Sequence, residues 1–390
     1  MRNNVKITTS SSWLSWLFKW FDEIVLELGR QMRLSYLPPL MVYFAAGISG
    51  LTAIAGTFFV KDYLGLSAEF LASLGFWAGL PWVLKMPLGH LVDLIWRWKF
   101  LLVYVGATLI AFSLSIMYGL ISHTQWFAAI APVEVWFVTS ALLSPAGYVI
   151  QDVVADAMTV EAVPSVDSEG NAYTENQNKS MHTTMQMLGR ISIISGTVAV
   201  ALLNVVLFSG VDEFSEQQKA ETYALIYLVA MAIPVISVLG VSLGQIIQFR
   251  ARKDYLARGF DPKEIQALLS PSQEDTKPNW WIFGGSAVFV VFTFAMGLGN
   301  FTYGQEIIFV GSMAIILFLI HRLLKELPEA QSYALIGTAA IVFVFRAVPL
   351  PGAGVTWWEV DVLGFDQQFL AVLTVITSIL TLLGMILLRP

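Results

Sequence analysis

The sequence contains no cysteine and few charged residues. Only 13% of its 390 residues are charged, and its four histidines (His90, His123, His182 and His321) lie far apart. Without thiolates the chain has neither a disulfide framework nor a cysteine ligand for a metal, and such dispersed histidines do not indicate a zinc site. P-loop, HExxH, GxGxxG and GxSxG motifs are also absent. We therefore expect a protein that is not an enzyme, with no cofactor, no metal and no nucleic-acid partner.

Apolar sequence is abundant instead. Hydrophobic residues make up 56% of the chain, the mean hydropathy is +0.69, and the apolar residues form long runs. About 20 apolar residues in a helix cross a bilayer. The pattern predicts an all-α, polytopic membrane protein with about ten transmembrane helices. Their expected ranges are 37–60, 70–92, 99–121, 126–158, 181–209, 221–248, 280–299, 304–325, 331–349 and 366–388.

Lysine and arginine gather on one side of this expected topology. With a cytoplasmic N-terminus, 17 of the 22 lie on the cytoplasmic side, two lie outside and three lie within spans. The positive-inside rule favours this orientation. We expect a multi-pass protein of the cell inner membrane that also contacts membrane lipids.

The polar segments predict a division into domains. Apolar residues at helical spacing in 13–28 predict an amphipathic helix on the membrane, within a cytoplasmic segment 1–36. A six-helix bundle follows at 37–249. Residues 250–279, which are basic and interrupted by prolines, predict a cytoplasmic linker. The last two parts are an inserted helix pair at 280–325 and the start of a C-terminal bundle at 331–390.

An internal repeat supports a two-bundle plan. DYLGLSAEFLA at 62–72 and DVLGFDQQFLA at 361–371 match at six of eleven positions. The repeat equates the ninth and tenth spans with the first and second, as in transporters built from two parallel bundles. The second bundle then has only two helices and is incomplete, so the chain resembles a fragment.

Charges inside apolar spans are the functional candidates. A charged side chain near the bilayer centre costs roughly 2.5–3.5 kcal/mol unless it faces a partner or a cavity. The charged residues within or near the end of a span are Lys85, Glu134, Asp152, Asp156, Arg190 and Arg346. Two small-residue pairs, Gly75-x-x-x-Gly79 and Gly240-x-x-x-Gly244, are interpreted as helix-packing contacts.

Asp152 and Asp156 lie on one helical stripe with Tyr148. Glu161 lies on the opposite side, nearer the cytoplasm, where pairing with a basic loop or a capping group is expected. Arg190 of the next span is the expected partner of an aspartate. An ion pair that only fixes helix packing is the alternative interpretation.

The turn after the second span carries Gly89-x-x-x-Asp93, followed by Arg97 and Lys99. This motif resembles the loop between the second and third helices of the major facilitator superfamily. The resemblance implies a gating loop, in which a carboxylate near basic groups forms a breakable latch. An ordinary charged loop that obeys the positive-inside rule is the alternative.

Within that superfamily the chain resembles the folate-biopterin transporter family. The residues that carry the likeness are Pro81-Trp82 with Lys85, Pro87, Gly89 and Asp93; Gln151-Asp152-Val153-Val154-Ala155-Asp156-Ala157 with Glu161; Phe345-Arg346-Ala347-Val348-Pro349; Leu363-Gly364-Phe365; and Phe369-Leu370. One departure is Met86, which separates the lysine from the proline that commonly follows it in the family.

The resemblance implies a major-facilitator-type bundle that moves an organic anion, such as a folate or a pterin, by alternating access. One role for Asp152 and Asp156 is proton uptake for symport. The other is binding the aminopyrimidinone edge of a pterin, while Lys85, Arg190 or Arg346 receives an anionic tail. Trp82 and Tyr148 are the aromatic candidates. Two alternatives stay open: a transporter of another metabolite or drug, and a non-transporting scaffold or pigment-assembly factor of the same fold.

Overall fold

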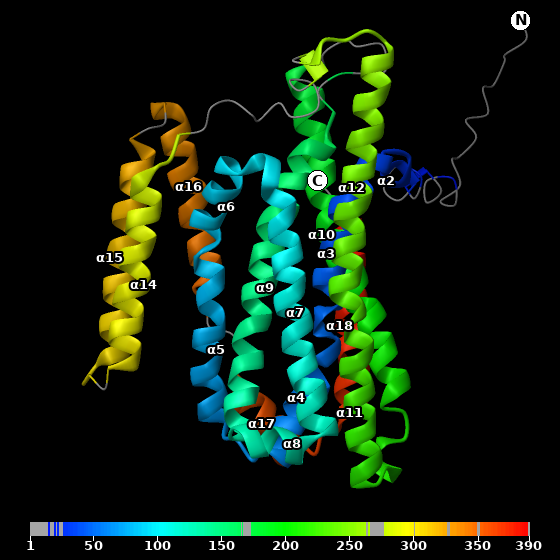
Figure 1. Ribbon diagram of the computed structural model, residues 1–390, viewed down its shortest axis with the longest axis vertical. Coiled ribbons are helices and arrows are strands. Elements are labelled where there is room, and N and C mark those ends of the chain that lie inside the picture. Colours follow the sequence, from blue (N-terminus) through cyan, green and yellow to red (C-terminus); the bar gives the residue numbers. More distant parts are fainter. Residues whose placement is uncertain are drawn as a thin grey trace, which may run out of the picture. The chain divides into compact units, whose positions relative to one another are not determined.

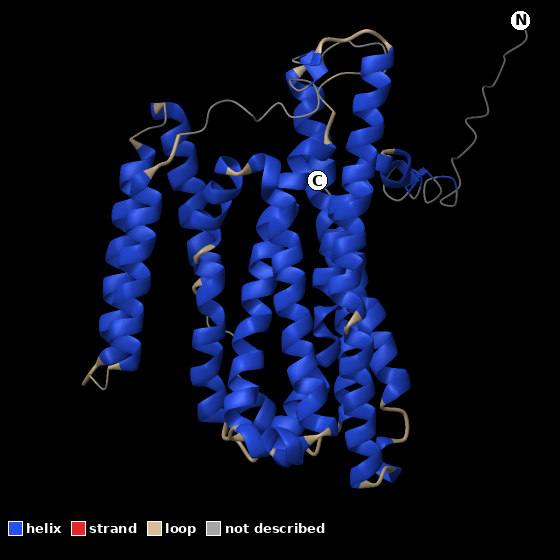
Figure 2. Ribbon diagram, in the orientation of Figure 1, coloured by secondary structure: helices blue, strands red, loops and turns tan. Residues whose placement is uncertain are grey.

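The computed structural model describes residues 26–164, 166, 173–262, 264–265, 277–299, 301–325, 328–348 and 352–388, with a few isolated positions before residue 26. The described chain is helical and contains no β-strand (Figure 2). The expectation of an all-α polytopic membrane protein is therefore confirmed. The amphipathic helix expected at 13–28 lies mostly outside the described residues. The structure is described without a break from residue 26, just before α2 (Glu27–Arg30).

Among the described residues, eight helical segments are long and apolar enough to cross a membrane. They are Leu34–Tyr63, Trp96–Ser122, Val133–Ala162, Glu175–Glu213, Glu216–Ala257, Trp280–Leu298, Gly304–Leu324 and Gln367–Leu387. Two of the ten expected spans do not meet this standard. The span expected at 70–92 is broken into two helices, and the one expected at 331–349 has a shorter apolar stretch, Gln331–Arg346.

The chain divides into two compact units, which we describe separately. The first unit runs to Phe59, resumes at Ala155–Pro271 and includes the residues from Asp366. Its helices are α2, α3 (Leu37–Ile48), α4 (Ala53–Phe58), the end of α9 (Val133–Ala162), α10 (Glu175–Leu207), α11 (Glu216–Ala230), α12 (Ala232–Ala257) and α18 (Gln367–Leu387). Helix α3 packs against α10 and α12, and α10 also packs against α18 (Figure 1).

Glycines allow these helices to approach closely. A Cβ on Gly196 of α10 would lie 2.7 Å from the Phe44 carbonyl oxygen on α3, and one on Gly240 of α12 would lie 2.9 Å from Met41 Cβ. On Gly244 it would lie 3.3 Å from Pro38 Cβ. Small residues favour helix association in lipid because backbones can then come into contact. The packing role predicted for Gly240 and Gly244 is confirmed.

The second unit contains Val60–Val154 and Ser272–Phe365. Its helices are α5 (Ala68–Val83), α6 (Lys85–Leu94), α7 (Lys99–Ser122), α8 (Thr124–Ile130), most of α9, α14 (Trp280–Leu298), α15 (Gly304–Leu324), α16 (Glu329–Arg346) and α17 (Ala353–Asp361). Helices α14 and α15, yellow in Figure 1, run side by side, and α17 packs against α5. Five shorter helical turns complete the described chain: η2 (Leu34–Tyr36), η3 (Ser49–Thr52), η4 (Phe59–Tyr63), η5 (Trp96–Trp98) and η6 (Val211–Glu213).

A proline explains why the second expected span is broken. Helix α5 ends at Val83, and α6 begins at Lys85 after Leu84, whose ψ of 4° lies outside the helical region. Pro87 has no N–H to bond the carbonyl of Val83, four residues earlier, and its ring clashes with that carbonyl in a regular helix. The break places Lys85 at the N-terminus of a new helix.

The packing role predicted for Gly75 and Gly79 is wrong. Nothing lies within 4 Å of a Cβ built on either glycine. Both instead line a groove bordered by α5, α14 and α15 within the second unit. The same sequence pattern therefore packs a helix in one place and leaves space in another.

The repeated segments adopt the same local structure. Gly65 (φ 61°) and Gly364 (φ 69°) both have left-handed backbone conformations. The amide of the residue after each glycine donates to the carbonyl six positions earlier: Leu66 to Val60, and Phe365 to Glu359. Both bonds reach one residue further back than the bond of the usual glycine-closed helix C-terminus. Ser67 and Asp366 then cap the next helix by accepting from the amides of Phe70 and Phe369. The repeat encodes a helix stop followed by a helix start.

The predicted domain boundaries (1–36, 37–249, 250–279, 280–325 and 331–390) stay a prediction. At one boundary the structure adds a detail. Helix α12 continues to Ala257, so the first residues of the expected linker, including Arg250, are helical. The first basic residues of the expected linker therefore belong to the last turns of α12.

Replacing either left-handed glycine by alanine should destabilise the protein. For Gly65→Ala and Gly364→Ala we expect a loss of about 1–2 kcal/mol each, because a Cβ is strained at positive φ. Gly354→Ala, inside α17 with open space around it, is the matched control and should be neutral or stabilising. Thermal unfolding of the purified variants measures the difference. Equal effects at all three positions would contradict the proposed role of φ.

Candidate functional site

An ion pair joins α6 to α9 in the second unit. The ammonium of Lys85 lies 2.5 Å from Oδ2 of Asp152. The side chain of Lys85 is 41% exposed, whereas that of Asp152 is only 17% exposed. Each charge would be costly alone in a helix that crosses lipid, and the pair neutralises both. Lys85 is thus a partner of Asp152 within this unit, a pairing that the sequence did not predict.

Asp152 lies deeper in its helix than expected. Helix α9 ends at Ala162, ten residues later, or about 15 Å along the helix axis. The N-terminal end of α9 also differs, because the expected span 126–158 is divided between α8 and α9. Glu134 consequently lies in the first turn of α9, where it is exposed.

A second carboxylate of α9 is held within the first unit. The hydroxyl of Tyr43, on α3, donates to Oδ1 of Asp156 at 2.5 Å. Tyr43 is only 6% exposed, and its ring occupies the space beside Gly189 of α10, where a Cβ would lie 2.8 Å from the ring. A tyrosine fixed in this way directs its O–H at the carboxylate. The sequence of the first expected span, 37–60, gave no signal that distinguished Tyr43 from its apolar neighbours.

Two further polar residues of α9 have partners in the first unit. The Thr159 hydroxyl donates to the Asp156 carbonyl at 2.6 Å, and the Gln186 amide of α10 donates to Thr159 at 3.4 Å. Glu161 accepts from the Gln248 amide of α12 at 3.1 Å. Glu161 is thus engaged by a neighbouring helix, and its expected pairing with a basic loop or a capping group stays a prediction.

Close packing against α7 fixes the part of α9 that carries Asp152. Gly106 and Gly147 meet backbone to backbone, since a Cβ on either would lie 2.6 Å from the other's carbonyl oxygen. Ser113 and Ser140 exchange hydrogen bonds, at 2.8 Å from Ser113 and 3.0 Å from Ser140 to the opposite carbonyl. Gln151, 3% exposed, donates to the Val103 carbonyl at 3.3 Å. These contacts hold the backbone beside Asp152.

The two arginine candidates lie in different units. Arg190 is exposed on α10 in the first unit. Arg346 is the last residue of α16, a helix that is exposed along almost all of its described length. Helical spacing gives the face of a residue but not the neighbour that occupies it, and the pairing of Arg190 with an aspartate stays a prediction.

The two aromatic candidates differ in their surroundings. Trp82 is 46% exposed at the end of α5. Tyr148 is half-buried on α9, one turn before Asp152. Contact of either residue with a substrate stays a prediction.

The expected gating loop forms the end of α6 and the turn η5. Gly89 approaches α9, where a Cβ would lie 4.0 Å from the Val153 side chain. Asp93 and Arg97 form no ion pair with each other in the described chain. Partial burial raises the pKa of the Asp93 carboxyl, and the nearby His90 opposes that shift. Lys99 is buried, with its ammonium 3.6 Å from the ring centroid of Trp96.

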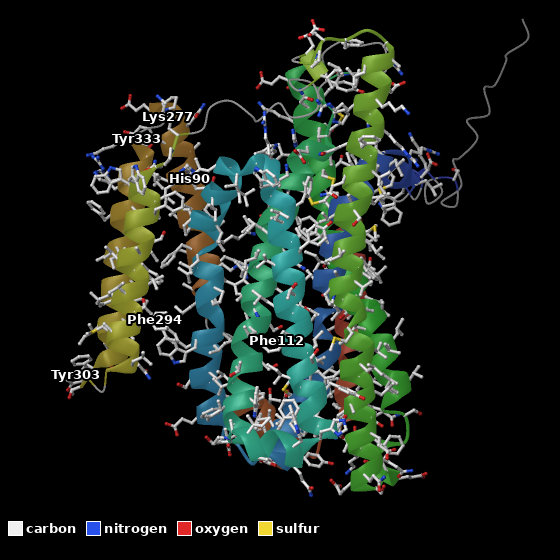
Figure 3. The ribbon with its side chains drawn as sticks, in the orientation of Figure 1. His90, Phe112, Lys277, Phe294, Tyr303 and Tyr333 are labelled. Atoms are coloured by element: carbon white, nitrogen blue, oxygen red, sulfur yellow. The ribbon has the colours of Figure 1, made fainter. Side chains whose placement is uncertain are left out.

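His90, labelled in Figure 3, connects this region to α14 within the second unit. Its Nε2 accepts a hydrogen bond from the Asn279 amide at 2.8 Å, and its ring centroid lies 5.2 Å from that of Phe283. Asn279 in turn caps α14 by accepting from the Trp281 amide. The sequence did not single out this contact, because its partners are almost 190 positions apart.

Replacing one member of the Lys85–Asp152 pair should lower the free energy of unfolding more than replacing both. For Lys85→Met or Asp152→Leu alone we expect a loss of about 2 kcal/mol, below the value for a fully buried pair because Lys85 is 41% exposed. The double variant should recover part of that loss. A double-mutant cycle on thermal unfolding measures the coupling. Additive effects would show that the pair contributes nothing.

Removing the Tyr43 hydroxyl should also destabilise the protein. Tyr43→Phe keeps the ring but deprives Asp156 of its donor, which costs about 1–3 kcal/mol. Tyr303→Phe is the matched control, since Tyr303 is 72% exposed and lies in the turn before α15 (Figure 3). The readout is the unfolding midpoint of each variant, and an equal midpoint for both would argue against the bond.

Comparisons with known proteins give one partial likeness and two negative results. No protein-family model matches the chain. No solved structure matches it. A folate-biopterin transporter of Synechocystis sp. is 38% identical over 68 residues, which make up 17% of this chain and 14% of that protein. The chain is therefore a multi-pass helical membrane protein with a partial likeness to a transporter.

Proposed function

We propose that the protein is a secondary active transporter that moves an organic anion across the membrane by alternating access. The observation that carries the proposal is the Lys85–Asp152 ion pair inside an apolar bundle. Charged groups at such depth are costly, and they mark substrate or proton pathways in many membrane proteins. The partial likeness to a transporter supports the same class of function.

The helix break strengthens the case for an anion. Lys85 is the first residue of α6, a helix of ten residues, so its ammonium lies where the helix dipole is positive. In transporters, discontinuous helices commonly direct such N-termini at anionic substrate groups. In our proposal the substrate anion takes the place of Asp152 beside Lys85.

Protonation of Asp152 supplies the coupling in this proposal. A protonated Asp152 no longer neutralises Lys85, so the lysine then attracts the anion. One proton and one anionic group thereby enter together, which is proton symport. Asp156, one turn further along α9, is the second candidate for proton uptake or for binding the polar edge of the substrate.

The substrate class in the proposal is a folate or a pterin, which the relative's name suggests for that protein. Arg190 and Arg346 are the further cations proposed to meet an anionic tail. Gly89, Asp93, Arg97 and Lys99 are proposed as the gating loop, with Trp82 and Tyr148 in contact with the solute. The proposed location is the cell inner membrane, with a cytoplasmic N-terminus.

Uptake by proteoliposomes tests the proposal. Labelled folate or a simple pterin should accumulate when the outside is more acidic, because protonation then loads Asp152. Asp152→Asn and Asp156→Asn should each lower gradient-driven uptake by roughly tenfold, equivalent to ~1.4 kcal/mol of coupling free energy. Asp212→Asn, at an exposed turn, is the control.

Three results would overturn parts of the proposal. Unchanged uptake in both aspartate variants would exclude both proposed roles. Uptake of another metabolite without folate or pterin uptake would change the substrate class. No flux at all, together with stable co-purification of a partner complex, would favour the scaffold or assembly-factor alternative.

A further inference from the structure

A groove of about 950 Å³ lies within the second unit, bordered by α5 on one side and by α14 and α15 on the other. Ligand pockets commonly have volumes of about 300–1,000 Å³. Its lining is mainly apolar, with Phe76, Phe289 and Phe309 among the side chains. Gly75 and Gly79 leave the α5 wall open, because no atom occupies the space where their side chains would be.

Two hydroxyls that line this groove lack hydrogen-bond partners among the described residues. They are Oγ1 of Thr293 on α14 and Oγ of Ser312 on α15, and Thr293 is only 1% exposed. Several helical threonines elsewhere in the chain donate to the carbonyl four residues earlier, as Thr338 does to Ala334 at 2.9 Å. A buried hydroxyl without a partner costs free energy. A bound acceptor facing Thr293 and Ser312 would remove this cost.

One end of the groove is polar. Glu69 is the only charged residue among the described residues that line it, and Gln305 lines it as well. Each is the second residue of its helix, so this end lies at the helix termini. Ser312 lies seven residues beyond Gln305, or about 10 Å further along the helix axis.

Apolar side chains line the groove beyond the hydroxyls, among them Phe289 on α14 and Ile316 on α15. Along α5 the lining runs from Glu69 to Val83, about 21 Å of helix. Trp77 bounds the groove on the polar side of Thr293, beside Gly297, where a Cβ would lie 2.7 Å from the indole. Its ring centroid lies 5.3 Å from that of Phe294, which is labelled in Figure 3. The groove thus presents an anionic end, two hydroxyl donors and then an apolar channel.

We propose that this groove binds a glycerolipid with an ammonium headgroup. The ammonium pairs with Glu69, the ester carbonyls accept from Thr293 and Ser312, and an acyl chain follows the open strip beside Gly75 and Gly79. The order of cation, ester and hydrocarbon along the lipid matches the order of carboxylate, hydroxyls and apolar wall. The lipid site uses none of the residues assigned to transport.

Native mass spectrometry of the purified protein tests this proposal. The protein is equilibrated with equal amounts of phosphatidylethanolamine and phosphatidylglycerol, and the retained lipids are counted. Wild-type protein should retain phosphatidylethanolamine preferentially. Gly79→Leu should lose it, because the new side chain fills the groove without meeting protein atoms at Cβ. Gly337→Leu, on α16 and also in open space, is the matched control and should retain the lipid.

Two further variants separate headgroup from ester recognition. Glu69→Gln should reduce the preference for phosphatidylethanolamine over phosphatidylglycerol by roughly tenfold, since a charge-assisted hydrogen bond is lost. Thr293→Val with Ser312→Ala should weaken retention of both lipids, whereas Thr338→Val should not.

Retention by Gly79→Leu equal to that of wild type would overturn the proposal. If Gly79→Leu does not fold, unchanged retention by the Thr293 and Ser312 double variant would overturn it instead. Displacement of the lipid by folate would reassign the groove to the substrate. Because the readout is bound lipid, a failure here is distinguishable from a failure of the transport proposal.

Discussion

The structure depends on the need to satisfy the polar groups of α9 in a chain of which only 13% is charged. In lipid there is no water to solvate a carboxylate or an amide, so the helix requires a protein partner for each one. Within the second unit Asp152 pairs with Lys85, and Gln151 bonds a carbonyl of α7. Within the first unit Asp156 accepts from Tyr43, and Glu161 accepts from Gln248. Most of the interhelical polar contacts we describe therefore converge on one helix.

Backbone irregularity gives the ion pair its position. A straight helix over 70–92 would place Lys85 in the middle of a span, with its backbone amide bonded inside the helix. Pro87 instead ends α5 at Val83, and Lys85 starts a new helix. The local loss of helical hydrogen bonds creates an N-terminus inside a region expected to be continuous. The same feature gives the proposed transport mechanism its cation and its positive helix end.

Small residues have two opposite consequences here. Gly196, Gly240 and Gly244 admit the backbone or side chains of α3, whereas Gly75 and Gly79 leave a groove beside α5. The difference arises from whether another helix occupies the face. Where a helix is present, glycine removes the steric barrier to contact. Where no helix is present, the absence of a side chain leaves open space. In the groove that space is lined by two hydroxyls that lack hydrogen-bond partners in the described chain.

The sequence by itself determined the helical membrane class, most of the spans and the repeated stop-and-start turn, because these follow from local hydropathy and from residues such as Gly65 and Ser67 that act on their neighbours. It also identified Lys85, Asp152 and Asp156, since isolated charges are conspicuous in apolar runs. Only the tertiary structure decided their partners. Neither the pairing of Asp152 with Lys85 nor the donation from Tyr43 to Asp156 was expected, because which helix faces a given stripe depends on the packing within its unit. The structure likewise separated the two glycine pairs, whose spacing is identical and whose surroundings are not.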